Sequence, residues 1–279
     1  MVRRRRLAAE LRRLREAAQL RTDEVAARLD CSASKIRRIE TGQVSVSPRD
    51  VRDLLQIYGV PDDQRDSLIQ LARESRQKGW WQTYGDSVEP HLATYLAMES
   101  TAAEIRVYRG SKLPGLLQTE DYARTVVGAN SPGIPRPGDE RSIAYRMERQ
   151  QQAKTRRPRL SVVLDEAALR RHVGGPDIMR AQLEHLIRLS AEAEMFLQIV
   201  PFAAGAQVLV ELPFAILAFP DRADPDVVCI RYPTGTVWLE DMPEVDTYNE
   251  LFRNLQAVAL SRDDSAALMT SAMKALRRL

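Results

Sequence analysis

The sequence predicts two domains, an all-α five-helix domain followed by an α+β domain with a largely antiparallel sheet. Three observations support this fold class. Apolar residues recur at helical spacing in five short segments that end near residue 75, and strand-like apolar segments flanked by helices cluster between residues 105 and 239. With 279 residues, 44% of them hydrophobic, the chain can also form two cores. No Gly/Ser-rich or Pro-rich spacer is present, so we place the boundary between domains 1–78 and 79–279.

Capping residues mark the helix starts in the first domain, which opens with a helix carrying Leu at heptad-like spacing. Thr22 and Ser32 are the expected N-caps of two short helices joined by a tight turn, because short polar side chains accept hydrogen bonds from free N–H groups. Gly42 is expected to end the second of these helices in the left-handed conformation. Ser47, with Pro48 at the first helical position, caps the next helix. In the second helix of the pair, the side chains that face outward or flank the core are Ala33, Ser34, Lys35, Arg37 and Arg38.

The second domain alternates between helical and strand-like segments. Its apolar runs of four to six residues are typical of buried strands, and most are bounded by Pro, Gly or charged residues. The predicted strands are 105–108, 160–164, 195–200, 214–219, 227–232 and 236–239. The predicted helices are 89–104, 119–127, 139–155, 165–173, 176–190, 244–260 and 263–277.

The composition of the helix expected between Ser32 and Gly42 predicts that it contacts DNA. A short helix with small side chains at its start and arginines behind them can enter a major groove. The charge distribution agrees, because residues 1–80 carry 18 Lys and Arg against 12 Asp and Glu, a net charge of +6. The remainder carries 23 against 26, a net charge of −3. We therefore expect double-stranded DNA as a partner. The alternative is an ordinary helical hairpin with a solvated charged face.

Caps, core spacing, turn and glycine all agree over the pattern Ala26-Ala27…Ser32-x-Ser34-x-Ile36-x-Arg38-Ile39-Glu40-x-Gly42. This pattern resembles the helix-turn-helix of Cro/cI-like regulators, the xenobiotic-response-element family. The resemblance implies that Ala33, Ser34, Lys35 and Arg37 lie at or near base edges. It also implies that Arg38 and the residues opening the first helix touch phosphates. In this chain Asp23 stands where the family often has a Gln that contacts the DNA backbone, so we expect that contact to be lost or moved to Arg21 or Thr22.

The second domain carries the run Leu113-Pro114-Gly115-Leu116-Leu117-Gln118-Thr119-Glu120-Asp121-Tyr122-Ala123-Arg124, which follows Trp80-Trp81 and a predicted helix. It is similar to the C-terminal domain of the WhiJ-like group of actinobacterial regulators, which pair a Cro/cI-like head with a poorly characterised body. The resemblance implies a transcription factor of development or specialised metabolism. Such proteins are often encoded beside a small partner protein, and some pairs have been likened to toxin–antitoxin modules.

Three aromatic residues at the domain boundary have two interpretations. Trp80, Trp81 and Tyr84 can line a ligand pocket, or they can pack the first domain against the second, which we favour. The loop from Pro114 to Thr119 is apolar for a loop, which suggests a buried turn or a pocket wall.

The sequence offers little for catalysis. Gly85-Asp86-Ser87 lacks a matched Asp/His pair, the three histidines form no metal-binding pattern, and Gly174-Gly175 fits a helix end better than a phosphate loop. Cys31 and Cys229 show no ligand spacing, and no signal peptide or membrane-spanning stretch is apparent. We therefore expect a cytoplasmic, nucleoid-associated protein with no metal or cofactor that is not an enzyme.

These observations predict a sequence-specific transcription regulator, a homodimer whose second domain responds to a ligand or a partner. The alternatives are an antitoxin-like DNA-binding protein that grips a small cognate partner, or a DNA-tethered enzyme or nucleotide-binding domain. The apolar residues of the last two helices are a candidate dimer surface, although such residues more often form the domain core: Leu251, Leu255, Val258, Leu268, Met269 and Met273.

Overall fold

The computed structural model describes residues 2–75, 79–88, 90–129, 139–208, 210–221, 224–232 and 235–276. The chain divides into two compact units, Met1–Trp80 and Trp81–Leu279, each of which is described by itself. This division falls two residues beyond the boundary placed from the sequence.

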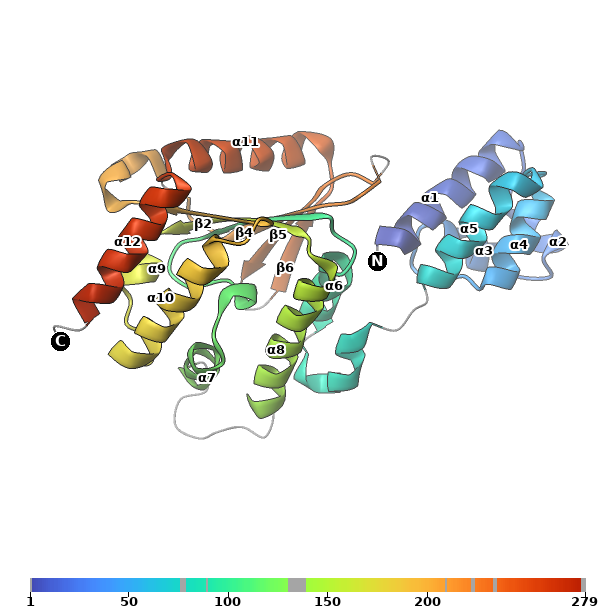
Figure 1. Cartoon of the computed structure of the whole chain (residues 1–279). Helices are drawn as coiled ribbons and strands as arrows, with labels where there is room; N and C mark the ends of the chain where they lie inside the picture. Colours follow the sequence, from blue (N-terminus) through green and yellow to red (C-terminus); the bar gives the residue numbers. More distant parts are fainter. Residues whose placement is uncertain are drawn as a thin grey trace. The chain divides into compact units, whose positions relative to one another are not determined.

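The first unit contains the five predicted helices (Figure 1). Their inward faces form one core, in which Leu7, Leu11, Ile36 and Leu55 are completely buried. The helices are α1 Val2–Ala17, α2 Thr22–Arg28, α3 Ala33–Glu40, α4 Pro48–Ile57 and α5 Asp62–Ser75.

Most of the predicted helix caps in this unit are confirmed. The Ser32 hydroxyl accepts from the Lys35 N–H at 3.2 Å, and Ser47 caps α4 in the same way, with Pro48 at its first position. Gly42 follows α3 with φ of 67°, a left-handed conformation that favours glycine.

The predicted cap of α2 is wrong by one residue. Thr22 is the first helical residue and Arg21 is the N-cap. The Glu24 carboxylate accepts from the Arg21 N–H at 2.7 Å. This bond is the carboxylate half of a capping box, and it takes over the stabilising role expected of the Thr22 hydroxyl.

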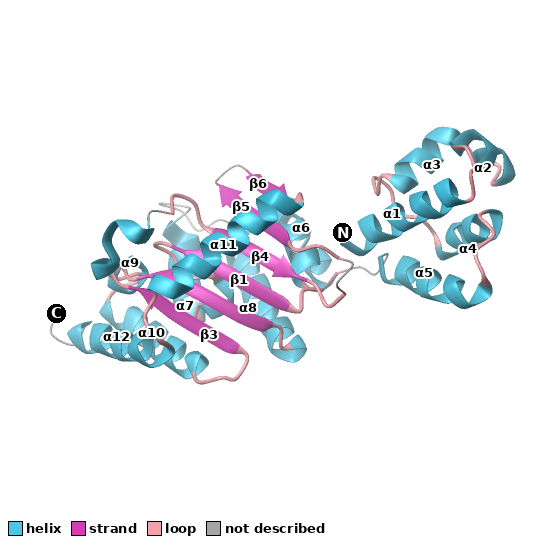
Figure 2. Ribbon diagram, turned by 90° about the horizontal axis from the view of Figure 1, so that it is seen from above, coloured by secondary structure: helices cyan, strands magenta, loops and turns pink. Residues whose placement is uncertain are grey.

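The second unit is an α+β domain built on one six-stranded mixed sheet (Figure 2). The strand order is β3-β2-β1-β4-β5-β6, and three of the five pairings are antiparallel. The β1–β2 and β2–β3 pairs are parallel, which requires the helical connections that the sequence places between them. The strands are β1 Glu104–Arg109, β2 Arg159–Asp165, β3 Met195–Val200, β4 Phe214–Ala218, β5 Val227–Tyr232 and β6 Gly235–Leu239.

Helices cover both faces of this sheet. In Figure 1, α11 crosses one face, and α6, α7, α8 and α10 lie on the other. The α-helices are α6 Pro90–Glu99, α7 Glu120–Ala129, α8 Asp139–Arg156, α9 Ala167–Arg170, α10 Pro176–Ser190, α11 Met242–Val258 and α12 Arg262–Ala275. The described residues also include the 3₁₀ segments η1 Trp80–Ser87 before α6, η2 Gly115–Leu117 between β1 and α7, and η3 Phe202–Val208 between β3 and β4.

Alternation along the strands places some side chains on the face of the sheet that α11 covers and their neighbours on the opposite face. Tyr108 and Phe214 belong to a core cluster on the α11 side, where Phe214 contacts Phe252 edge-on at 6.4 Å between ring centroids. Their strand neighbours point to the opposite face. Arg109, at the end of β1, and Arg231, at the end of β5, therefore lie on the side of the sheet that α8 covers.

Candidate nucleic-acid interface and two cavities

Helix α3 presents a polar outer face above an apolar inner one. Ile36 and Ile39 are buried, with 0% and 3% of their surfaces exposed. The exposed side chains are Ser32, Ser34, Lys35, Arg37 and Arg38. Ala33 is half-buried and packs against the core, so only part of its surface is accessible to solvent. The helix thus exposes hydrogen-bonding and cationic groups of the kinds that read bases and contact phosphates.

Helix α3 is anchored at its last residue by an ion pair that the sequence analysis missed. The Arg15 guanidinium of α1 donates to both carboxylate oxygens of Glu40, at 2.8 and 3.0 Å. It also donates to the carbonyl oxygen of Leu20 at 2.9 Å, in the turn before α2. A carboxylate in the last turn of a helix opposes the helix dipole. That mismatch at Glu40 was the sequence signal for a nearby cation.

Two cations of this surface, Arg21 before α2 and Lys35 within α3, are engaged in ion pairs that are exposed or partly exposed. Arg21 lies 2.9 Å from Asp23, and the Lys35 ammonium lies 3.4 Å from an Asp50 oxygen on α4. Thr22 is half-buried at the start of α2. Solvent-exposed pairs contribute little stability, so Arg21 and Lys35 can exchange their carboxylates for DNA phosphates at small cost.

The aromatic residues at the boundary are half-buried. Trp80, Trp81 and Tyr84 all belong to η1. Tyr84 packs edge-on against Tyr145 of α8, with ring centroids 6.4 Å apart, and the Arg141 guanidinium donates to the carbonyl oxygen of Thr83 at 3.1 Å. None of the three is among the described residues that line either cavity discussed below.

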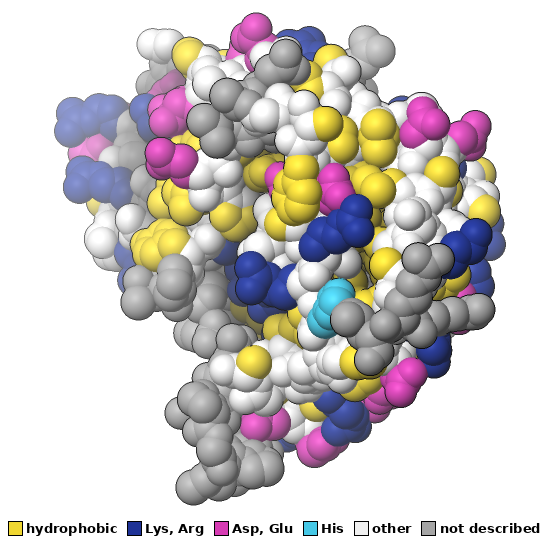
Figure 3. All heavy atoms as spheres, turned by 90° about the vertical axis from the view of Figure 1, so that its left-hand side faces the viewer, with side chains coloured by type: hydrophobic (Ala, Val, Ile, Leu, Met, Phe, Trp, Pro, Cys, Tyr) yellow, Lys and Arg dark blue, Asp and Glu magenta, His cyan; other side chains and the backbone are white. Residues whose placement is uncertain are grey.

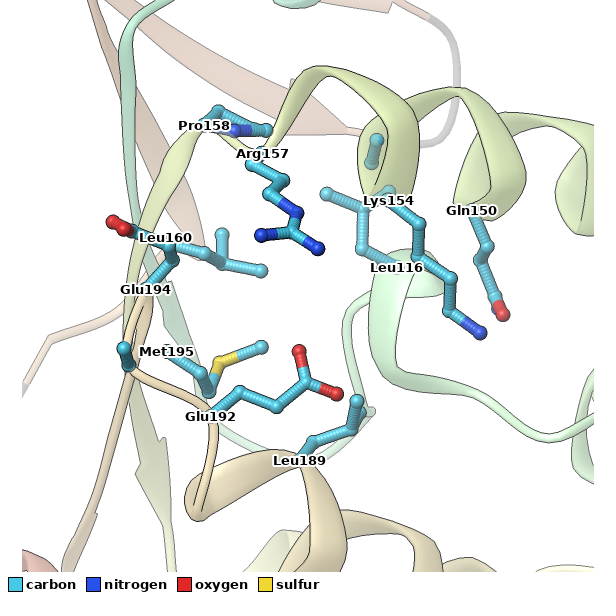
Figure 4. A pocket seen from close by; sticks show the side chains of 12 residues that line it. Leu116, Gln150, Lys154, Arg157, Pro158, Leu160, Leu189, Glu192, Glu194 and Met195 are labelled. Atoms are coloured by element: carbon cyan, nitrogen blue, oxygen red, sulfur yellow. The ribbon is translucent and has the colours of Figure 1, made fainter.

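One cavity in the second unit has a volume of about 500 Å³ and lies between the end of α8, η2 and the start of β3 (Figure 4). Leu116, Leu160 and Met195 form its apolar wall. Arg157 and Glu192 extend into the space from different sides, as Figure 4 shows. Arg157 has φ of 52°, a left-handed conformation that is costly for a residue other than glycine.

The second cavity, of about 260 Å³, shares Leu116 and Leu160 with the first. We call it the basic cavity, because its walls carry five cationic side chains and no carboxylate. The cations come from the ends of β1 and β5, from the loop after β1 and from α8: Arg109, Lys112, Arg146, Arg149 and Arg231. The loop from Leu113 to Gln118 also lines it, so the apolar loop noted in the sequence is both a buried turn and a pocket wall.

The cations of the basic cavity are unequally compensated. Arg149 is buried and forms a two-bond ion pair with buried Glu99, one of its hydrogen bonds being 2.7 Å long. Among the described residues, Arg109, Lys112 and Arg231 make no ion pair. Burial lowers the pKa of the Arg109 guanidinium, and the neighbouring Arg231 and Arg149 lower it further.

Lys112 lines the mouth of this cavity, where its side chain is exposed to solvent but the surrounding surface is concave. Its partial loss of hydration lowers the pKa of its ammonium group to about 8. Repulsion from Arg146, Arg231 and Arg109 acts in the same direction. A site that depresses the pKa of lysine is one that would gain from a bound anion.

The outer surface of the second unit differs from this cavity. On the face formed by α9, α10 and α12, Lys and Arg side chains are interspersed with Asp, Glu and hydrophobic ones (Figure 3). In the described part of the chain, no group of three His, Cys, Asp or Glu residues is placed to hold a metal ion. The described helices include none long and apolar enough to cross a membrane.

Comparison with known families agrees with this geometry. Residues 6–68 match the family described as a helix-turn-helix domain, and this range spans α1 to α4 and the start of α5. The match and the exposed face of α3 indicate a DNA-binding regulator. Residues 92–271, well over half of the chain, match the family described as a domain of unknown function (DUF5753). The chain belongs to that family. No curated protein and no solved structure matched it.

Proposed function

We propose that this protein is a sequence-specific transcription regulator of the WhiJ-like type, with a Cro/cI-like head that binds double-stranded DNA as part of a homodimer. The observation that carries the proposal is the outer face of α3. Ser34 and Arg37 stand exposed between a capped start and an end that Arg15 holds in place. A recognition helix needs this rigid presentation, because base readout depends on side chains held at fixed depth in the groove.

Dimerisation follows from the size of the interface. One recognition helix covers only a few base pairs, so specificity normally requires two heads on half-sites about one helical turn apart. Part of the surface suggested by the sequence is unavailable for this purpose. Leu255 and Met269 are buried in the domain core, with 2% and 0% of their surfaces exposed. Leu251 and Val258 also pack partly against that core, so the interface must use other residues as well.

The second domain is proposed to respond to a small molecule or to a small cognate protein. Two cavities in it supply space for a small molecule. The proposal assigns no reaction, cofactor or metal to the chain, and places it in the cytoplasm, on the nucleoid.

Band-shift titration of the full chain against its own promoter and against scrambled DNA tests the proposal, with sedimentation of the protein alone and with DNA. We expect tight promoter binding, weaker binding to scrambled DNA, a steep loss of affinity with salt and a dimer at micromolar concentration. Equal affinity for both sequences, or a monomer bound to the promoter, would overturn it. Mass spectrometry of proteins that co-purify from the native host separates an antitoxin-like role from response to a small molecule.

A further inference from the structure

We propose that the basic cavity binds a compact ligand with two or more oxyanion charges, such as a phosphate ester or a small polycarboxylate. The first argument is charge balance. Five cations line the cavity. Arg149 is paired with the buried carboxylate of Glu99, whereas Arg109, Lys112 and Arg231 make no ion pair with any residue that the structure describes. Arg109 and Arg231 are half-buried and Lys112 stands at the mouth, so their like charges repel one another in a concave site with reduced hydration, and a bound anion would offset that repulsion.

The second argument is the position of the cavity in the sheet. β1 and β5 run parallel to each other, since both pair antiparallel with β4. Arg109, the last residue of β1, and Arg231, the last but one of β5, therefore lie at the same end of the sheet. This end also lies where the parallel half of the sheet meets the antiparallel half, next to the carboxyl end of β1. Ligands of open α/β sheets commonly bind outside such strand ends, at a switch in topology.

The third argument is the shape and chemistry of the walls. Guanidinium groups bind carboxylate and phosphate oxygens through paired N–H donors. Gly115 leaves room for one of these groups, since a Cβ there would lie 3.1 Å from an Arg149 nitrogen. The volume of about 260 Å³ is below the usual range for drug-sized ligands, so the ligand is small and its charge is concentrated.

The cavity also touches a route toward the first domain. Tyr145 lines it, and Tyr84 of η1 packs against Tyr145. A ligand that moves Tyr145 would therefore be felt in the segment that directly follows the first unit. This regulatory consequence rests on the proposed function, whereas ligand binding itself does not.

Calorimetric titration of the full chain with pyrophosphate, and separately with citrate, tests the site at constant ionic strength. Arg109→Gln and Arg231→Gln should weaken binding about tenfold or more, since each removes a charge-assisted contact. Arg253→Gln, an exposed change on α11, removes the same charge elsewhere and should bind as the parent does. Preference for pyrophosphate indicates a phosphorylated ligand, and preference for citrate indicates a polycarboxylate.

Thermal unfolding without ligand separates a binding role from a structural one. Removing one of several repelling cations should keep or raise the Tm of Arg109→Gln and Arg231→Gln, whereas loss of a structural arginine would lower it. Lys112→Gln at the exposed mouth repeats the binding test with little demand on folding. Absence of saturable binding to both anions, or equal loss in Arg253→Gln, would overturn the proposal. DNA affinity measured in parallel reports on the regulator function independently.

Discussion

Arg15 and Glu40 form an ion pair that joins α1 to the last residue of α3. Their side chains are only 12% and 6% exposed, and two hydrogen bonds connect them. The residues are 25 positions apart, so the pair fixes α3 against α1 across the first unit. A buried pair of this kind stabilises less by its own attraction than by the penalty that follows when one partner is lost.

The first prediction is that Arg15→Leu destabilises the first domain by about 3 kcal/mol, because Glu40 is left as a buried carboxylate without a partner. Urea unfolding measures the change. The double variant Arg15→Met/Glu40→Met should recover most of this loss. Arg12→Leu, which breaks the exposed Arg12–Glu16 pair on the same helix, is the matched control and should leave stability unchanged. Equal losses in Arg15→Leu and Arg12→Leu would contradict a special role for Arg15.

The second prediction separates phosphate contacts from base contacts on α3. Arg38→Ala should weaken binding to every sequence and reduce the salt dependence, because a phosphate contact carries no sequence information. Ser34→Ala and Arg37→Ala should each cost about 1–3 kcal/mol on the specific site and little on scrambled DNA. Band-shift titrations at two salt concentrations measure both effects. A loss in Arg38→Ala confined to the specific site would reverse the assigned roles.

The helices and strands of this fold follow from local patterns, whereas the pairing of its strands does not. The six strands and the five helices of the first unit lie close to their predicted positions because side-chain periodicity is a local signal. The observed N-cap of α2 is one residue before the predicted one, because the Glu24 carboxylate accepts from the Arg21 N–H. Helix starts one residue apart differ little in energy, so the sequence does not decide between them. The parallel pairing of β1, β2 and β3 depends on contacts between distant segments, which no local pattern specifies.

The same reason explains which site residues were missed. The exposed face of α3 was predictable because helical spacing decides which side chains point outward. Arg109, Lys112 and Arg231 come from separate strands and loops, and only the order of strands brings them into one cavity. Their sequence neighbourhoods show single charges at strand ends, a pattern that surface residues share. The large aromatic residues at the domain boundary were a candidate pocket wall, but they are not among the described residues that line the basic cavity: Trp80, Trp81 and Tyr84.

The third prediction concerns the ion pair between Lys35 and Asp50, at 3.4 Å. Asp50→Asn should increase DNA affinity about two- to fivefold, the range expected when an exposed carboxylate stops competing for Lys35. The shape of the helix start should be kept, since the Asp50 N–H still donates to Ser47. Fluorescence anisotropy with labelled DNA measures the change. Asp53→Asn, a substitution of the same kind on α4, is a control for charge alone, and an equal gain there would contradict a local effect.

The fourth prediction is that anion binding to the basic cavity is coupled to proton uptake by Lys112. The pKa of its ammonium group is about 8 in the free protein, against an ordinary value of 10.5. Partial loss of hydration at the cavity mouth is the main cause of this depression, and the cations Arg146, Arg231 and Arg109 add to it; a bound anion offsets the repulsion and raises the pKa. At a pH between the pKa of Lys112 in the free protein and its higher pKa in the complex, the complex therefore binds more protons than the free protein does. Affinity is therefore expected to be highest below pH 8 and to fall as the pH rises above it.

Calorimetry at pH 8.5 in two buffers of different ionisation enthalpy measures this coupling directly. The observed binding enthalpy should shift between the buffers by an amount that corresponds to net proton uptake, because the buffer must supply the proton that Lys112 takes up. Lys112→Met removes the titrating group, so its binding enthalpy should no longer depend on the buffer through this residue. At pH 6.5 Lys112 is already protonated in the free protein, so it takes up no proton on binding. Its contribution to the difference in binding enthalpy between the two buffers should therefore vanish at this pH as well. Proton release at pH 8.5, or uptake that persists unchanged in Lys112→Met, would show that the anion does not bind beside Lys112.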